Sequence, residues 1–490
     1  MGINFLKKEG VYMSNNAKNG KLSFPALTAM VIGSMVGAGV FMLPARFAGS
    51  TGVYGSLIAW LIAGTGMLML AFVFQALAIR KPDLNAGVFS YAREGFGDYI
   101  GFTTAIGFWA SACAGNVTYW VLIKSTLGQF IPIFGVGDTI PAIVISSIGI
   151  WLFFLLICRG VQQAAIINTI VTIAKVIPII TFVVVLLFHF DFETFKNNFS
   201  GTYSGYSLSL FEQISKTMLL TVFVFLGIEG ASVYSKFAKT RKMVGKATVL
   251  GFISVLCLFM LVSMVPFGIL SQQDIAGITQ PSMAGVFASI FGDSGNAFIS
   301  IGLIVSVLGA YLAWSLMAAE VLFTAAEAGD TPPFLKKVNS NGSPVNALLL
   351  SSSLTQIILI VTYFSDNALN LALDLTSALA LLPFFFSAAF ALKIAIKKDG
   401  YDGIDKGTIT REKIVAGIAC VYTIFLLYIA GLQFLPLCCL LLAPATILFA
   451  WARKLQNKPI FDTKEKIVFA ILCIGAIVAI IGLIQGFITI

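Results

Sequence analysis

Long apolar segments recur along the chain and restrict it to one class of fold. Thirteen runs of about 20 mainly apolar residues are each long enough for a helix to cross the hydrocarbon core of a bilayer. A transmembrane strand would instead show about ten residues of alternating polarity. The approximate ranges are 24–45, 54–79, 100–128, 140–158, 162–188, 210–234, 247–271, 297–324, 346–363, 367–392, 412–431, 433–451 and 467–489. We therefore expect an all-α integral membrane protein with about thirteen spans.

The composition leaves little room for a soluble domain. Hydrophobic residues make up 58% of the 490 residues and charged residues 11%, where soluble chains have about 45–50% and about 25%. The first 22 residues are polar and basic, and the apolar run that follows is too long and too interrupted by glycine for a signal peptide. We expect a cytoplasmic tail at 1–23 and a lipid environment for most of the chain.

Lysine and arginine residues gather in alternate loops. With thirteen spans, 26 of the 31 basic residues fall on the side of the N-terminus, and only Arg46 and Lys196 fall on the other side. Basic loops face the cytoplasm, so the N-terminus is expected inside the cell and the C-terminus outside. The net charge of +9 is then a topology signal and gives no reason to expect a nucleic-acid partner.

The chain offers no sequence pattern for a metal or cofactor site. Its seven cysteines all lie in apolar runs, none in a C-x-x-C pattern, and His189 is the single histidine. We interpret the cysteines as small apolar residues in helices and expect no cofactor.

Glycine interrupts the first and sixth predicted spans. Gly33, Gly37 and Gly39 lie within seven residues, and Gly227 and Gly230 flank an acid, Glu229. Such interruptions in corresponding halves of a chain indicate a transporter site, where freed amides can hold a carboxylate and freed carbonyls an ammonium. The alternative for the first glycines is a helix-packing motif; a phosphate loop is excluded, because no Gly-Lys-Ser/Thr follows them.

Four further residues in the predicted spans are candidates for function. Intramembrane ionisable groups suggest function by default, so Lys175 is either a proton carrier or a fixed cation that braces the first break, and Glu229 either takes part in coupling or bonds to unwound backbone. Asn116 could contact substrate or form a hydrogen bond between helices. Trp314 could stack on an organic cation or simply fill the core.

The sequence resembles the amino acid–polyamine–organocation superfamily over nearly its whole length. The segments 37–41 (Gly-Ala-Gly-Val-Phe) and 225–231 (Phe-Leu-Gly-Ile-Glu-Gly-Ala) carry this likeness. The loop segments 80–84, 91–98 and 244–248 are similar to those of basic amino acid/polyamine antiporters, nearest to arginine:ornithine exchangers. The resemblance implies a LeuT-like fold of two inverted five-helix repeats, at 24–188 and 210–392, with additional C-terminal spans at 412–489.

The resemblance also implies a set of site residues. The amides around Ala38 and Gly39 would hold the substrate carboxylate, and Trp314 would stack on a cationic side chain. Lys175 resembles a lysine of proton-coupled relatives. The implied substrate-binding residues are Val36, Gly37, Ala38, Gly39, Asn116, Phe223, Leu226, Gly227 and Trp314, with Lys175 and Glu229 in coupling or gating.

Two residues depart from the pattern of the similar acid-resistance arginine exchangers. Phe223 stands where those proteins have a gating tryptophan, and Ala38 replaces a serine whose hydroxyl helps to bind carboxylate. The departures put the gate and the side-chain contacts to the carboxylate in question, whereas binding by the backbone is unaffected.

These observations predict a transporter in the cytoplasmic membrane of a bacterium that exchanges a cationic amino acid for its metabolic product. The exchange of arginine for ornithine is the first choice. Histidine for histamine, another amino acid–amine pair and a proton-coupled symporter are the alternatives. A channel would need a continuous polar pore, a receptor a signalling domain and an enzyme a nucleophile–base set, and none of these is visible. A homodimer is left open.

The charge distribution gives a prediction about topology. A cysteine that replaces Lys242 should react with a membrane-impermeant maleimide only after cells are permeabilised, because the loop at 236–246 is expected in the cytoplasm. Labelling of this cysteine in intact cells would contradict the thirteen-span topology.

Overall fold

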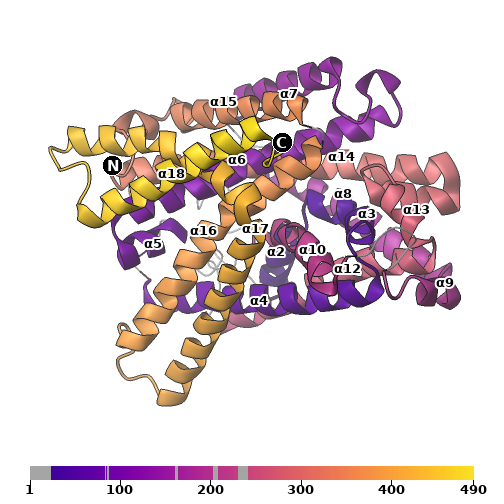
Figure 1. The fold of residues 1–490 in the computed structure, drawn as a ribbon, viewed down its shortest axis with the longest axis horizontal. Coiled ribbons are helices and arrows are strands. Elements are labelled where there is room, and N and C mark those ends of the chain that lie inside the picture. The colour runs from indigo at the N-terminus through magenta and orange to yellow at the C-terminus, as the bar shows by residue number, and fades with distance from the viewer. Residues whose placement is uncertain are drawn as a thin grey trace.

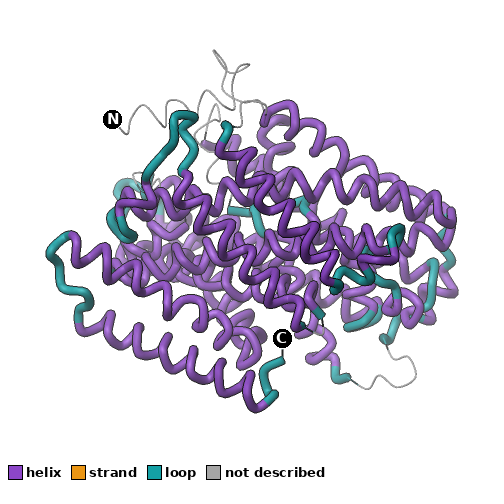
Figure 2. The backbone as a smooth tube through the Cα atoms, turned by 90° about the horizontal axis from the view of Figure 1, so that it is seen from above, coloured by secondary structure: helices purple, strands orange, loops and turns teal. Residues whose placement is uncertain are grey.

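Helices form almost the whole of the structure (Figure 2). The computed structural model describes residues 24–82, 84, 88–160, 164–201, 208–229, 241–365 and 367–489, and no strand occurs in these ranges. The helices are α2 (Phe24–Met35), η1 (Ala38–Met42), α3 (Leu43–Ala48), α4 (Val53–Arg80), α5 (Val88–Phe96), α6 (Asp98–Gly128), η2 (Pro132–Phe134), α7 (Ile140–Cys158), α8 (Ala164–Phe188), α9 (Phe192–Asn197), α10 (Leu210–Phe225), α12 (Arg241–Met264), η4 (Val265–Gly268), α13 (Gln272–Gly277), α14 (Ser282–Glu327), η5 (Pro333–Lys336), α15 (Val345–Val361), η6 (Thr362–Phe364), α16 (Ala368–Lys397), α17 (Lys406–Leu455) and α18 (Thr463–Gln485).

Nine helices within the described ranges are long and apolar enough to cross a membrane. They confirm an all-α integral membrane protein, whereas thirteen spans and the inverted repeat stay predictions. The predicted spans at 24–45 and 210–234 are not continuous helices, because α2 ends at Met35 and α10 ends at Phe225. These two interruptions are described below.

Two very long helices contain a non-helical glycine. α17 runs for 50 residues, but Gly431 has φ 50° and ψ −153°, at the boundary between the predicted spans 412–431 and 433–451. α14 runs for 46 residues, and Gly292 has φ 61° and ψ −147°. Its part after Gly292 includes the predicted span at 297–324. A positive φ is accessible to glycine at little cost, so a single residue can redirect a long apolar helix.

α6 forms the centre of the bundle. Nearly all of its residues are buried, and it packs against α14 and α16. In Figure 1, α4 runs along one edge, and α7 and α15 run along the opposite edge. α7 and α18 expose many apolar side chains, as helices that face lipid do. A helix as enclosed as α6 can present side chains to a site in the interior of the protein.

Ion pairs connect the C-terminal helices to the start of α6. Arg453 at the end of α17 lies 3.1 Å from Asp98 and 3.5 Å from Glu465 of α18. Arg80 at the end of α4 forms a two-point ion pair with Glu412 of α17, at 2.8 and 3.2 Å. Each of these ion pairs joins helix ends that lie far apart in the sequence.

Candidate functional site

The first interruption separates α2 from η1. α2 ends at Met35, and Gly37 has the extended conformation φ −116°, ψ −151° before η1 begins at Ala38. η1 continues directly into α3, so Ala38–Ala48 is one short helical segment. Such a break leaves carbonyls at the end of α2 and the first amides of the next segment without partners inside the helix. The three glycines of the sequence therefore mark the interruption that they predicted.

The second interruption follows α10. Leu226 leaves the helix with φ −56° and ψ 135°, and Gly227 has φ +104°. A Cβ atom at this glycine would lie 2.3 Å from the carbonyl oxygen of Ser34. Any larger residue at 227 would thus collide with the end of α2, besides being strained by the positive φ. The two interruptions touch each other through their backbones.

Two charged side chains bond to the backbone at these interruptions. Lys175 of α8 donates from Nζ to the carbonyl oxygen of Gly33 at 2.6 Å. In a continuous helix that oxygen would accept from the amide of Gly37, which is extended here. Glu229 accepts from the amide of Gly227 through Oε2 at 3.1 Å. Both ionisable side chains therefore hold backbone that the breaks expose, within the buried interior.

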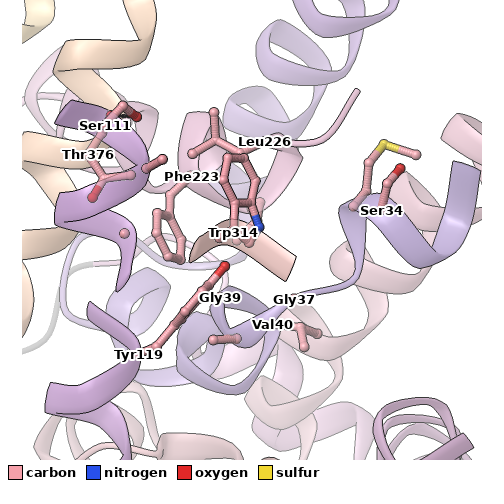
Figure 3. A pocket seen from close by; sticks show the side chains of 15 residues that line it. Ser34, Gly37, Gly39, Val40, Ser111, Tyr119, Phe223, Leu226, Trp314 and Thr376 are labelled. Atoms are coloured by element: carbon pink, nitrogen blue, oxygen red, sulfur yellow. Dashed lines mark hydrogen bonds between the residues drawn. The ribbon is translucent and has the colours of Figure 1, made fainter. Parts of the chain in front are cut away.

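A small pocket lies beside the two interruptions (Figure 3). It offers only about 20 Å³ in which the centre of a water molecule fits, too little for an amino acid. It is lined by residues of the first break and by side chains from α6, α10, α14 and α16: Ser34, Met35, Gly37, Ala38, Gly39, Val40, Ser111, Ala112, Gly115, Tyr119, Phe223, Val224, Leu226, Trp314 and Thr376. An amino acid could enter this pocket only if the elements that line it moved apart.

Contacts between η1 and α10 explain why the pocket is small. A Cβ atom at Gly39 would lie 2.6 Å from Val224 and 3.0 Å from the ring of Phe223. Figure 3 shows the rings of Phe223 and Trp314 next to each other, with Leu226 beside one end of the Trp314 ring. Trp314 is half-buried, and its ring also lies 6.4 Å from that of Phe108. The aromatic side chains and the glycine backbone together enclose the space.

The structure brings most of the predicted site residues together. Six of them line the pocket: Gly37, Ala38, Gly39, Phe223, Leu226 and Trp314. Val36 and Gly227 lie at the breaks, outside the lining. Asn116 also lies outside it and donates from Nδ2 to Ser315 Oγ at 3.1 Å, between α6 and α14. The sequence left two interpretations of Asn116, a substrate contact or a hydrogen bond between helices, and this bond is of the second kind. The predicted residue Gly230 lies outside the described residues.

Sequence reasoning missed the pocket hydroxyl groups of Ser111, Tyr119 and Thr376, as well as that of Ser34 at the end of α2. The first two share one face of α6 with Gly115, since residues four apart lie above one another on a helix. That regular spacing was the available signal. It is weak on its own, because α6 is buried on all sides and carries other hydroxyl residues.

Comparisons with known proteins agree on the family of this chain. The family described as amino acid permease matches residues 22–477. An arginine/ornithine antiporter of Pseudomonas aeruginosa is 46% identical over 96% of this chain and 98% of that protein. An arginine/agmatine antiporter of Chlamydia abortus is 40% identical, with 96% and 98% covered. An L-lysine transport protein of Corynebacterium glutamicum is 38% identical over 95% of each chain.

The hydrogen bond from Lys175 gives a stability prediction. Lys175→Met should lower the free energy of unfolding by about 1–3 kcal/mol, because the Gly33 carbonyl then lacks its donor in the buried interior. Lys175→Arg should restore part of the loss. The melting temperature of purified protein in lipid nanodiscs measures this, with Lys196→Met, on the exposed side of α9, as control. Equal melting temperatures for the two methionine variants would show that Lys175 does not brace the break.

Proposed function

The chain belongs to the amino acid permease family, and from this premise we propose that it exchanges arginine for ornithine across the cytoplasmic membrane of a bacterium by alternating access. It is a transporter and not an enzyme, as its relatives are. The observation that carries the proposal is the pocket at two touching helix breaks. A relative with 46% identity along almost the entire chain is an arginine/ornithine antiporter, which favours this pair of substrates.

We propose that backbone groups at the breaks bind the amino acid part of the substrate. The amides of Ala38 and Gly39 open a helical segment, where unpaired N–H groups and the helix dipole favour a carboxylate. The carbonyls of Val36 and Leu226 are proposed to accept hydrogen bonds from the α-ammonium. Because these contacts come from the backbone, they are common to all amino acids and leave the choice of side chain to the rest of the pocket.

Trp314 is proposed to select a cationic side chain. The face of a tryptophan attracts a cation by about 0.5–1 kcal/mol when exposed and about 2 kcal/mol when desolvated. The ring carries no formal charge, so it does not retain the cation as tightly as a buried carboxylate would. Phe223 faces the same space and is proposed to close over the substrate. Asn116 supports this arrangement through its bond to Ser315, the neighbour of Trp314.

Lys175 and Glu229 are proposed to act in gating through the backbone that they hold. Opening of the pocket requires η1 to move away from α10, and both side chains bond next to that contact. The corresponding positions of the two breaks support inverted repeats at 24–188 and 210–392 followed by spans at 412–489. An external C-terminus and a homodimer stay predictions.

The exchange itself can be measured in proteoliposomes. Uptake of labelled arginine should be slow into empty vesicles and fast into vesicles loaded with ornithine, because the site of an antiporter changes from one side of the membrane to the other efficiently only with substrate bound. Parallel loading with agmatine, lysine, histamine and buffer identifies the exchanged product. Equal uptake into empty and loaded vesicles would contradict exchange, and a rate that follows an imposed pH gradient would indicate a proton-coupled symporter.

Removal of the Trp314 ring should weaken the binding of arginine. We expect Trp314→Leu to raise Kd by roughly tenfold or more, because about 1.4 kcal/mol corresponds to one decade in affinity. Trp314→Phe should restore part of the loss. Calorimetry on folded, purified variants measures the effect. If Trp314 only fills the core, both variants bind arginine normally and melt at lower temperature.

A further inference from the structure

Tyr119 projects from α6 into the pocket. Its side chain is 6% exposed, and it lines the pocket together with Ser111 and Gly115 of the same helix. A Cβ atom at Gly37 would lie 3.9 Å from the Tyr119 hydroxyl oxygen. Figure 3 shows this hydroxyl at the tip of a side chain directed toward the segment that contains Gly37 and Gly39. The hydroxyl therefore lies at the first helix break, and the ring spans the distance from α6.

The Tyr119 hydroxyl has no hydrogen-bond partner among the described residues. The other hydroxyls of the pocket do: Ser111 donates to the carbonyl of Thr376 at 2.7 Å, and Thr376 donates to the carbonyl of Ala372 at 2.6 Å. Ser34 donates to the carbonyl of Val31 at 2.8 Å. A buried tyrosine hydroxyl usually finds a partner, so this free donor, at the pocket, is suited to a ligand.

The surroundings of this hydroxyl select the kind of ligand group. It faces the amino end of the helical segment Ala38–Ala48, whose unpaired amides and dipole favour an anion. No side-chain hydroxyl comes from the segment itself at this point, because residue 38 is alanine. A phenol O–H donates well to a carboxylate, and hydrogen bonds to charged groups are the stronger ones. The site thus has backbone donors on one side and one side-chain donor on the other.

We propose that the Tyr119 hydroxyl donates a hydrogen bond to the α-carboxylate of the substrate and so makes the site prefer an amino acid over the corresponding decarboxylated amine. The inference rests on the proposed function and goes beyond it, because it assigns this discrimination to one side chain. The tyrosine supplies from α6 the hydroxyl that Ala38 lacks. The amine, which has no carboxylate, gains nothing from the phenol.

The test removes one hydroxyl from the protein and compares the binding of ligands that have a carboxylate with the binding of one that lacks it. Binding of arginine, ornithine and agmatine is measured by calorimetry on the native protein, on Tyr119→Phe and on Tyr422→Phe. The control, Tyr422, is a buried tyrosine of α17 that packs on Gly66 of α4 and lies outside the pocket. Both variants keep the aromatic ring, and their melting temperatures establish that they are folded.

We expect Tyr119→Phe to weaken binding of arginine and of ornithine by roughly 10- to 100-fold, the loss of a hydrogen bond to a charged group, and to leave agmatine unchanged. Tyr422→Phe should leave all three affinities unchanged. The ratio of arginine to agmatine affinity within one variant does not depend on the fraction of active protein.

Two outcomes would overturn the role of Tyr119. Unchanged binding of arginine in Tyr119→Phe would show that the hydroxyl does not touch the substrate. An equal loss for arginine and agmatine would show that it acts on the side chain or on the shape of the pocket. Failure of the native protein to bind any of the three ligands would overturn the proposed function first, and with it this inference, so the two failures are distinguishable.

Discussion

The contact between Gly227 and the carbonyl of Ser34 is the constraint on which the site depends. A Cβ atom at 227 would lie 2.3 Å from that oxygen, so two interrupted helices cross at a point where only glycine fits. Inside a bilayer, backbone groups that leave a helix need partners within the protein. Lys175 and Glu229 supply two of them. The residues that open η1 line a pocket, so an interruption that costs stability can become a binding site.

The sequence predicted those parts of the site whose residue patterns have few structural explanations. Glycines close together in an apolar span weaken a helix, and the interruptions predicted at Gly37 and Gly227 are present in the structure. Lys175 was recognisable because a buried lysine needs a partner, and one of its two interpretations, a brace on the first break, matches its bond to Gly33. Trp314 was recognised through family resemblance, and it does line the pocket.

Other parts of the site depend on tertiary packing and could not be predicted. Asn116 and Tyr119 are three residues apart on α6, yet the first bonds to α14 and the second reaches the pocket. On a helix that is buried all round, periodicity does not show which face meets a ligand. The redirection of α14 at Gly292 was likewise hidden, because an isolated glycine in an apolar run is often accommodated within a helix.

The proposed mechanism requires that an amino acid binds between the start of η1 and the ring of Trp314. A cryo-electron microscopy structure of the protein with arginine bound tests it most directly. We expect the carboxylate within hydrogen-bond distance, about 3 Å, of the amides of Ala38 and Gly39, with the guanidinium against Trp314. Arginine bound away from the two interruptions, with the contact between η1 and α10 unchanged, would contradict it.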